Sequence, residues 1–180
     1  MFGLTGKVVL LTGATGGIGK SIAKRMKEKG ARLILSGTRQ KILDELCLEL
    51  GDDTKAIATD LTSKESILSL AQESETFFGH IDILINNAGI TADNLFLRMK
   101  DEEWENVINV NLSASMRLTR QVIKGMLKRK SGRIIFISSI VGYTGNTGQA
   151  NYSASKSALS GLTKSIALEV AARGITCNLI

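Results

Sequence analysis

The fold is decided by the stretch Lys7-Val8-Val9-Leu10-Leu11-Thr12-Gly13-Ala14-Thr15-Gly16-Gly17-Ile18-Gly19. A short apolar run leads directly into a glycine-rich turn, and a helical pattern through Ile22, Ala23 and Met26 follows. This order predicts a strand, a turn with exposed backbone N–H groups, and a helix whose N-terminus faces the turn. Such a unit suits the pyrophosphate of a dinucleotide.

The glycines of the turn have different expected tasks. Gly13 allows the tight turn, Gly17 lets the chain approach a ligand, and Gly19 lets the helix close on the sheet. The spacing is G-x-x-x-G-x-G instead of the more common G-x-G-x-x-G. By itself it is a weak signal, but its place in the first strand-to-helix unit favours a nucleotide site. The cofactor-binding residues expected here are Gly13, Thr15, Gly16, Gly17, Ile18 and Gly19.

Strands and helices are predicted to alternate along the whole chain. Strands are expected over residues 7–12, 31–35, 55–59, 81–85, 133–137 and 175–180, and helices after the first strand and over 40–50, 64–78, 104–128 and 151–173. This alternation predicts a single α/β domain, a parallel sheet wound with helices on both faces in the Rossmann manner.

The end of the second strand bears on the identity of the cofactor. An NAD site usually has Asp or Glu there to accept from the ribose 2′-hydroxyl. This chain has Ser36-Gly37-Thr38-Arg39 instead. Hydroxyls at Thr38 and the guanidinium of Arg39 suit a 2′-phosphate, so NADP(H) is the predicted cofactor. Alternatively, Arg39 only begins the next helix as a solvated residue.

Polar residues also follow the third and fourth strands. Asp60, before Leu61, can accept from an adenine amino group or cap the helix over 64–78, and both roles can hold together. Asn87, Ala88 and Gly89 can brace a loop beside the ribose, although alone they indicate only a turn. Asn111 interrupts the apolar stripe of helix 104–128, either as a structural bridge or as part of a water-mediated proton path.

Chemistry is concentrated in residues 138–156. Ser139 lies at the carboxyl end of the fifth strand, and Tyr152 and Lys156 are i, i+4 neighbours on one helical face. A phenol ordinarily titrates near ~10, and a nearby ammonium lowers that pKa. Tyr152 can then donate a proton to a carbonyl oxygen that is becoming an alkoxide, and Ser139 can hydrogen-bond the same oxygen. An isolated Tyr-x-x-x-Lys is more often a packed ring beside a surface lysine.

Composition excludes several other classes. The chain has no 18-residue apolar stretch and no signal-peptide pattern, so we expect a cytoplasmic protein without a membrane span. The net charge of +6 suits an anionic ligand, whereas 4% aromatic content argues against nucleic acid. His80 has no second histidine, so no metal site is expected, and Cys47 and Cys177 are expected to be free thiols.

Several motifs together, in this order and spacing, resemble the short-chain dehydrogenase/reductase superfamily over the whole chain. They are Thr12-Gly13-x-x-x-Gly17-x-Gly19, Asn86-Asn87-Ala88-Gly89, Asn111, Ser139 and Tyr152-x-x-x-Lys156. The resemblance implies that Tyr152 is the general acid and that Lys156 lowers its pKa and holds the nicotinamide ribose. It also implies that Ser139 orients the ketone and that Asn111 holds a water linking Lys156 to solvent.

A closer similarity is to bacterial reductases that act on 3-oxoacyl chains attached to acyl carrier protein. It is carried by Gly142, by Gly148-Gln149-Ala150-Asn151-Tyr152 and by the stretch from Glu169 to Asn178. This implies NADPH-dependent reduction in fatty acid biosynthesis, Gln149 at the substrate, and a homo-oligomer that is tetrameric at full length. Related dehydrogenases for acyl-CoA, sugars or polyols are the alternative.

Acyl carrier protein is acidic, so Arg129, Lys130 and Arg173 become candidates for its docking patch, unless they are only solvated helix ends. The superfamily continues after the sixth strand with a Pro-Gly turn, a substrate lid and a last strand. The sequence stops at Ile180 and contains no proline. We therefore expect a truncated form, and a non-catalytic NADP-binding protein is the alternative this raises.

Overall fold

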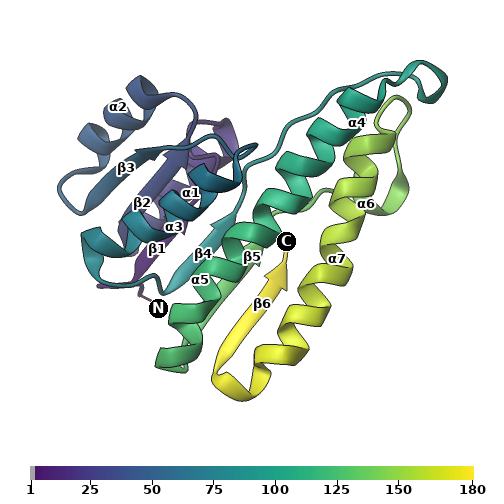
Figure 1. Cartoon of the computed structure of the whole chain (residues 1–180). Helices are drawn as coiled ribbons and strands as arrows, with labels where there is room; N and C mark the ends of the chain where they lie inside the picture. The colour runs from purple at the N-terminus through teal and green to yellow at the C-terminus, as the bar shows by residue number, and fades with distance from the viewer. Residues whose placement is uncertain (1–2) are drawn as a thin grey trace.

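The structure, a computed structural model, describes residues 3–180. Its centre is one six-stranded sheet in the order β3-β2-β1-β4-β5-β6, with every neighbouring pair parallel (Figure 1). The strands are β1 (Val8–Leu11), β2 (Arg32–Gly37), β3 (Thr54–Ala58), β4 (Ile83–Asn86), β5 (Gly132–Phe136) and β6 (Ile175–Leu179). The winding direction reverses between β1 and β4, which opens a crevice at the carboxyl ends of these strands. The predicted doubly wound parallel sheet is confirmed.

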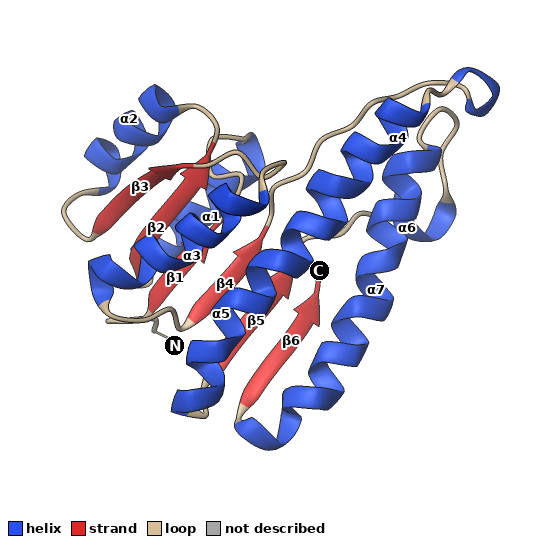
Figure 2. Ribbon diagram, viewed as in Figure 1, coloured by secondary structure: helices blue, strands red, loops and turns tan. Residues whose placement is uncertain are grey.

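Helices cover both faces of the sheet (Figure 2). On one face lie α1 (Gly17–Glu28) and α2 (Gln40–Leu50), which pack against Val9 and Leu11. On the other lie α3 (Lys64–Phe78), α5 (Ser115–Arg129) and α7 (Ala150–Val170), which pack around Leu10 and Phe136. The central β1 is buried on both faces, which explains why it reads as an unbroken apolar run. Among the described residues, no helix is both long and apolar enough to cross a bilayer.

The helix expected over 104–128 is more complex than its apolar stripe predicts. It consists of α4 (Asp101–Ile108), a π-helical segment η2 (Asn109–Ala114) and then α5. It begins three residues early because the Glu103 carboxylate accepts from the Lys100 N–H at 2.8 Å, and an acidic first turn suits a helix N-terminus. Apolar periodicity does not report either feature.

Short helical turns complete the chain. The segment η1 (Phe96–Arg98) precedes α4, and η3 (Ala171–Arg173) ends the helix that carries Tyr152. The loop expected after β5 contains the short helix α6 (Val141–Thr144). Gly142 lets α6 pack closely on α7, because a Cβ there would lie 3.0 Å from the Lys156 carbonyl carbon in α7.

The capping role considered for Asp60 is wrong. Ser63 is the N-cap of α3, and its Oγ accepts from the Ser66 N–H at 3.1 Å. Asp60 lies three residues earlier and its Oδ1 accepts instead from Thr62, from the N–H at 2.8 Å and from the hydroxyl at 2.7 Å. The carboxylate therefore shapes the turn after β3 and does not cap the helix.

Candidate active site

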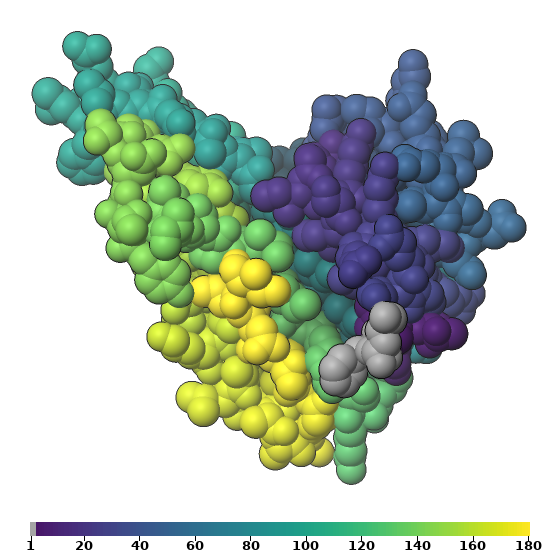
Figure 3. Space-filling model, turned by 180° about the vertical axis from the view of Figure 1, so that it is seen from behind, coloured from purple at the N-terminus to yellow at the C-terminus, as the bar shows by residue number. Residues whose placement is uncertain are grey.

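A cavity of about 700 Å³ opens at the carboxyl ends of the strands. The space-filling view shows the molecule hollowed between its purple-to-blue part and its teal-to-yellow part (Figure 3). The lining comes from the segments that follow five of the six strands, namely residues 13, 15–19, 37–39, 59–62, 87–91 and 137–138, together with Asn106, Val110, Tyr152 and Lys156. Residues far apart in the sequence therefore meet at the topological switch point, as the parallel sheet requires.

The glycine turn leaves room for an anionic group. Gly13 has φ +66°, and a Cβ there would lie 2.8 Å from the Ala88 Cα. A Cβ on Gly19 would lie 2.8 Å from the Ala14 Cα, whereas one on Gly17 would meet nothing within 4 Å. Helix α1 starts at Gly17 with no side-chain cap and no acidic residue in its first turn. Its positive end therefore faces the cavity and fits the pyrophosphate of a dinucleotide.

Thr12 ties the turn to the segment after β4. Its Oγ1 accepts from the N–H groups of Asn87 and Ala88, each at 3.1 Å. The Asn87 amide donates in return to the carbonyl oxygens of Thr12 at 2.9 Å and Gly13 at 3.2 Å. Asn87, expected to brace a loop, thus holds the ends of β1 and β4 together.

Arg39 and Asp60 lie at the same end of the cavity, and both are exposed. The Arg39 guanidinium donates to the Thr15 carbonyl at 2.9 Å, which holds it over the glycine turn. Two hydrogen bonds from Thr62 hold the pKa of Asp60 below its usual value, and the bond from the hydroxyl contributes more than the bond from the N–H. The Arg39 guanidinium can bind a phosphate. Asp60 uses only Oδ1 for Thr62, so its second carboxylate oxygen can accept from an adenine amino group. Thr38 and Leu61 also line this end.

Tyr152 and Lys156 lie at the opposite end of the cavity. The Lys156 Nζ is 5.6 Å from the centroid of the Tyr152 ring and donates to the Ile137 carbonyl at 2.8 Å. Lys156 is only 4% exposed, and this burial lowers its pKa from 10.5 to about 8. The i, i+4 spacing thus places an ammonium beside the phenol at the wall of the cavity.

Asn111 is a structural bridge, one of the two roles considered for it. It is 1% exposed, and its Oδ1 accepts from the Ile90 N–H at 2.8 Å. Its Nδ2 donates to the Ile90 carbonyl at 3.0 Å and to the Ser155 Oγ at 3.1 Å. A Cβ on Gly89 would lie 3.4 Å from both Asn111 Oδ1 and Lys156 Nζ, so this wall is tightly built. The water-mediated proton path stays a prediction.

The structure brings Ser138, and not Ser139, into the cavity lining. The Ser138 hydroxyl donates to the Lys156 carbonyl at 3.1 Å and so holds β5 to α7. Ser139 is half-buried, and its carbonyl accepts from the Gly142 N–H at 3.0 Å. Its role in orienting a substrate stays a prediction.

Sequence reasoning missed two residues beside Tyr152 and Lys156. Asn151 is fully buried, and its amide donates to the carbonyls of Ala92 at 2.9 Å and Glu103 at 3.3 Å. Ser155 accepts from Asn111 and donates to the Tyr152 carbonyl at 2.7 Å. Each directly precedes a predicted catalytic residue, and a polar side chain on the buried side of a helix was the available signal. Asn151 thus fixes α7 against the segment after β4, and Ser155 fixes it against η2 through Asn111.

Gln149 lies in the loop before α7. Its Nε2 donates to the Asp93 carboxylate at 3.0 Å, and its Oε1 accepts from the Asn146 amide at 3.0 Å. It therefore joins the loop before α7 to the segment after β4. Its contact with a substrate stays a prediction.

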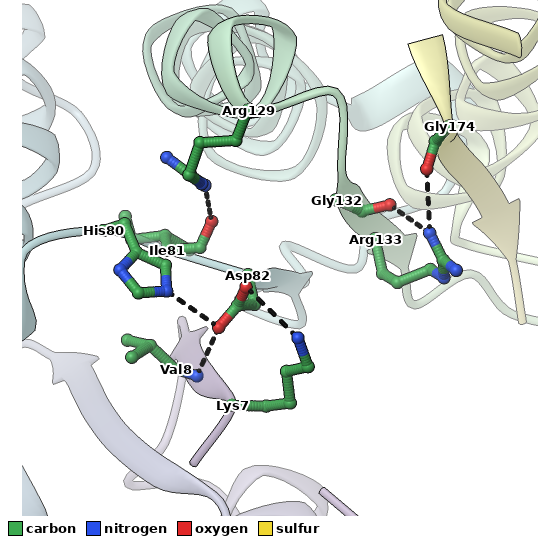
Figure 4. Close-up of polar contacts among 9 residues, drawn as sticks. All are labelled: Lys7, Val8, His80, Ile81, Asp82, Arg129, Gly132, Arg133 and Gly174. Carbon is green, nitrogen blue, oxygen red and sulfur yellow. Dashed lines mark hydrogen bonds and ion pairs between the residues drawn. The ribbon is translucent and has the colours of Figure 1, made fainter. Parts of the chain in front are cut away.

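The basic residues proposed for carrier-protein docking lie elsewhere. Arg129 and Lys130 precede β5 and Arg173 precedes β6, so all three lie at the amino ends of the strands. Arg129 is exposed, and its guanidinium donates to the Ile81 carbonyl at 2.6 Å (Figure 4). The length of β5, roughly 16 Å at ~3.3 Å per residue, separates them from the cavity of the same chain.

Comparison with known proteins agrees with this arrangement. The model of the short chain dehydrogenase family matches residues 7–180. Nodulation protein G of Rhizobium sp. (strain N33) is 48% identical over 180 residues, which are 100% of this chain and 74% of that protein. The 3-oxoacyl-(acyl-carrier-protein) reductase FabG of Haemophilus influenzae is 48% identical over 98% of this chain and 73% of its own length. FabG of Escherichia coli is 47% identical over 97% and 72%. The chain belongs to the short-chain dehydrogenase/reductase family of nicotinamide-dependent oxidoreductases.

Proposed function

We propose that this protein reduces the 3-oxo group of acyl chains carried by acyl carrier protein, with NADPH as the reductant, in fatty acid biosynthesis. Relatives that are 48% and 47% identical over nearly the whole chain bear that reductase name. The structural observation that supports it most directly is the pair Tyr152 and Lys156 at the wall of a cavity shaped for a dinucleotide.

The residues of this chain account for the proton that a carbonyl reduction consumes. Bound NADPH supplies the hydride that the carbonyl carbon accepts. Tyr152 donates its hydroxyl proton to the carbonyl oxygen as that oxygen gains negative charge. The Lys156 ammonium, held by the Ile137 carbonyl at 2.8 Å, stabilises the phenolate that remains. Ser139 would orient the ketone from the end of β5.

The segment after β4 forms the wall beside this pair. Asn111 holds Ile90 through both of its backbone groups, and this fixes the neighbouring Gly89 against Lys156. A fixed wall limits the positions that the nicotinamide and the ketone can take, which is a large part of catalysis by positioning. Lys156, close to Gly89, is also placed to hold the nicotinamide ribose.

NADPH is preferred over NADH in this proposal because of the end of β2. No carboxylate follows that strand, and the exposed Arg39 guanidinium is held over Thr15 at the rim of the cavity. The donors that Thr15 does not occupy can pair with a 2′-phosphate, and a guanidinium does so bidentately.

We keep Arg129, Lys130 and Arg173 as a carrier-protein patch for the assembled homo-oligomer only. In one chain they lie at the end of the sheet away from the cavity. A carrier docked there would have to serve a cavity contributed by a neighbouring copy.

An assay with matched substrates tests the proposed function. The purified protein is given NADPH or NADH with acetoacetyl-acyl carrier protein, acetoacetyl-CoA or a panel of sugars and polyols, and the absorbance of the reduced cofactor is followed. We expect the highest kcat/KM with NADPH and the carrier-linked substrate. A preference for a sugar, for NADH, or for the CoA ester would contradict the respective part of the proposal, and tight NADPH binding with no turnover would indicate a non-catalytic protein.

A further inference from the structure

The π-helical segment η2 contacts both ends of the cavity. Asn109 and Asn111 are two residues apart, so their side chains point in nearly opposite directions from the helix axis. Asn111 holds Ile90 near Lys156, whereas the Asn109 Nδ2 donates to the Thr62 carbonyl at 3.3 Å. π-Helical turns are frequent at functional sites, and here one turn braces two walls.

Arg117 determines which way the Asn109 amide faces. Its Nη1 donates to the Asn109 Oδ1 at 2.7 Å, from a position eight residues further along the helix. A guanidinium can only donate, so the oxygen of the Asn109 amide must face Arg117 and its NH₂ must face Thr62. The Arg117 contact thereby aims the donor that holds the Thr62 carbonyl.

Thr62 passes this constraint to Asp60. Its N–H and hydroxyl both donate to Asp60 Oδ1, which leaves the second carboxylate oxygen available. The turn over residues 59–62 lines the cavity at the end where Arg39 lies. Asp60, Thr62, Asn109 and Arg117 thus form one continuous chain of hydrogen bonds from the cavity to α5.

We infer that Asn109 and Arg117 are positioning residues for the adenine end of the cofactor. Neither residue lines the cavity; they hold the Asp60–Thr62 turn where it would receive the adenine ring and its amino group. This inference rests on the proposed function for the identity of the cofactor. The segment formed by η2 and α5 would thus support cofactor binding, in addition to placing Asn111.

Binding of adenosine 2′,5′-bisphosphate, which contains only the adenine end, tests the inference by calorimetry. Asn109→Leu removes both hydrogen bonds and Arg117→Met removes the one that aims the amide. Arg120→Met, at an exposed position on the same helix, is the matched control. We expect roughly three- to tenfold weaker binding for the first two variants and no change for the control. In turnover assays, KM for NADPH should rise by a similar factor while kcat stays within about twofold.

Asn109→Asp separates positioning from general stabilisation of the helix. An aspartate keeps an acceptor for Arg117 but cannot donate to the Thr62 carbonyl. We expect it to bind the bisphosphate as weakly as Asn109→Leu does. Wild-type binding by Asn109→Asp, or a loss in kcat without a change in KM, would overturn the inference. Because Asn109→Asp retains the Arg117 contact, it serves if Asn109→Leu does not fold.

The outcomes for the two proposals can be told apart. If the wild type binds the bisphosphate but reduces no 3-oxoacyl substrate, the proposed function fails while the binding comparison still decides the inference. If the wild type binds neither the bisphosphate nor NADPH, both proposals are overturned.

Discussion

The two ends of the cavity are built in different ways. At the end proposed to hold the adenine, here called the adenine end, Arg39, Asp60 and Thr62 are exposed, and each is held by one or two hydrogen bonds to its own loop or a neighbouring one. At the catalytic end, Asn111, Asn151 and Lys156 are almost fully buried. Asn111 alone makes three hydrogen bonds there.

This difference suits the roles that we propose for the two ends. Proton transfer requires atoms held to within fractions of an ångström, and burial strengthens the electrostatic interactions between them. A buried polar group that lacks a hydrogen bond costs free energy, and the buried polar groups of the catalytic end form a dense network. The adenine end only has to recognise a ligand, which exposed groups at the rim can do. Substitutions at the catalytic end should therefore lower mainly kcat, whereas substitutions at the adenine end should weaken mainly cofactor binding.

Tyr152→Phe should remove the proposed proton donor at the catalytic end and produce the largest effect, a loss of kcat. Loss of the proton donor should lower kcat by roughly 10²- to 10⁴-fold, while affinity for the cofactor changes little. Turnover assays and fluorescence titration with NADPH measure the two quantities. Retention of near wild-type kcat would remove Tyr152 from the role of general acid.

A pair of glycine variants should affect the pyrophosphate turn between the two ends, one through stability and the other through cofactor binding. Gly19→Ala places a Cβ 2.8 Å from the Ala14 Cα, which we expect to cost at least ~1–3 kcal/mol of unfolding free energy. Gly17→Ala meets nothing within 4 Å, so it should fold normally and weaken only cofactor binding. Urea unfolding and NADPH titration of both variants check this. Equal stability of the two variants would show that the turn relaxes more than the structure implies.

The burial of Lys156 should make stability depend on pH at the catalytic end. Its pKa falls from 10.5 when unfolded to about 8 when folded, so between these values the unfolded chain holds a proton that the folded chain has lost. The unfolding free energy should therefore rise with pH across this window, by at most ~1.4 kcal/mol per pH unit. The stability difference between the wild type and Lys156→Met, from urea unfolding, should grow with pH accordingly.

The exposed Lys164 of the same helix is the matched control for that measurement. Lys164→Met measures the effect of removing an exposed lysine from this helix, and the pH dependence for Lys156→Met is compared with it. A Lys156→Met difference that does not change with pH would mean that the Lys156 ammonium is not disfavoured in the folded protein.

Arg39→Met, at the exposed adenine end, should produce the smallest effect, which should differ between NADPH and NADH. Removal of the guanidinium should weaken NADPH binding roughly tenfold, about 1.4 kcal/mol, and leave NADH binding nearly unchanged. Titration with each cofactor measures this. Equal losses for the two cofactors would argue against pairing with the 2′-phosphate.

The fold and several neighbourhoods of the site could be predicted from local patterns. The helices over 40–50 and 64–78 have the bounds that the sequence predicts, since their apolar spacing is regular and a glycine follows each. Tyr152 and Lys156 are neighbours because i, i+4 spacing on a helix leaves no other arrangement. The π-helical segment at Asn109 has no local signature and was missed. The N-cap could have been predicted, because Ser63 directly precedes the helix start at Lys64 and serine is a preferred N-cap residue.

The sequence alone determined the parallel sheet, the glycine turn below a helix N-terminus and the tyrosine-lysine pair, because periodicity, backbone freedom and helical spacing act over a few residues. Only the tertiary structure decided that Ser138 lines the cavity, that Asn109 reaches Thr62, and that Arg129 turns away from the cavity toward Ile81. The last two contacts join residues 47 and 48 positions apart in the sequence, and Ser138 is held by Lys156, 18 positions away. The packing of the whole sheet and its helices brings such segments together.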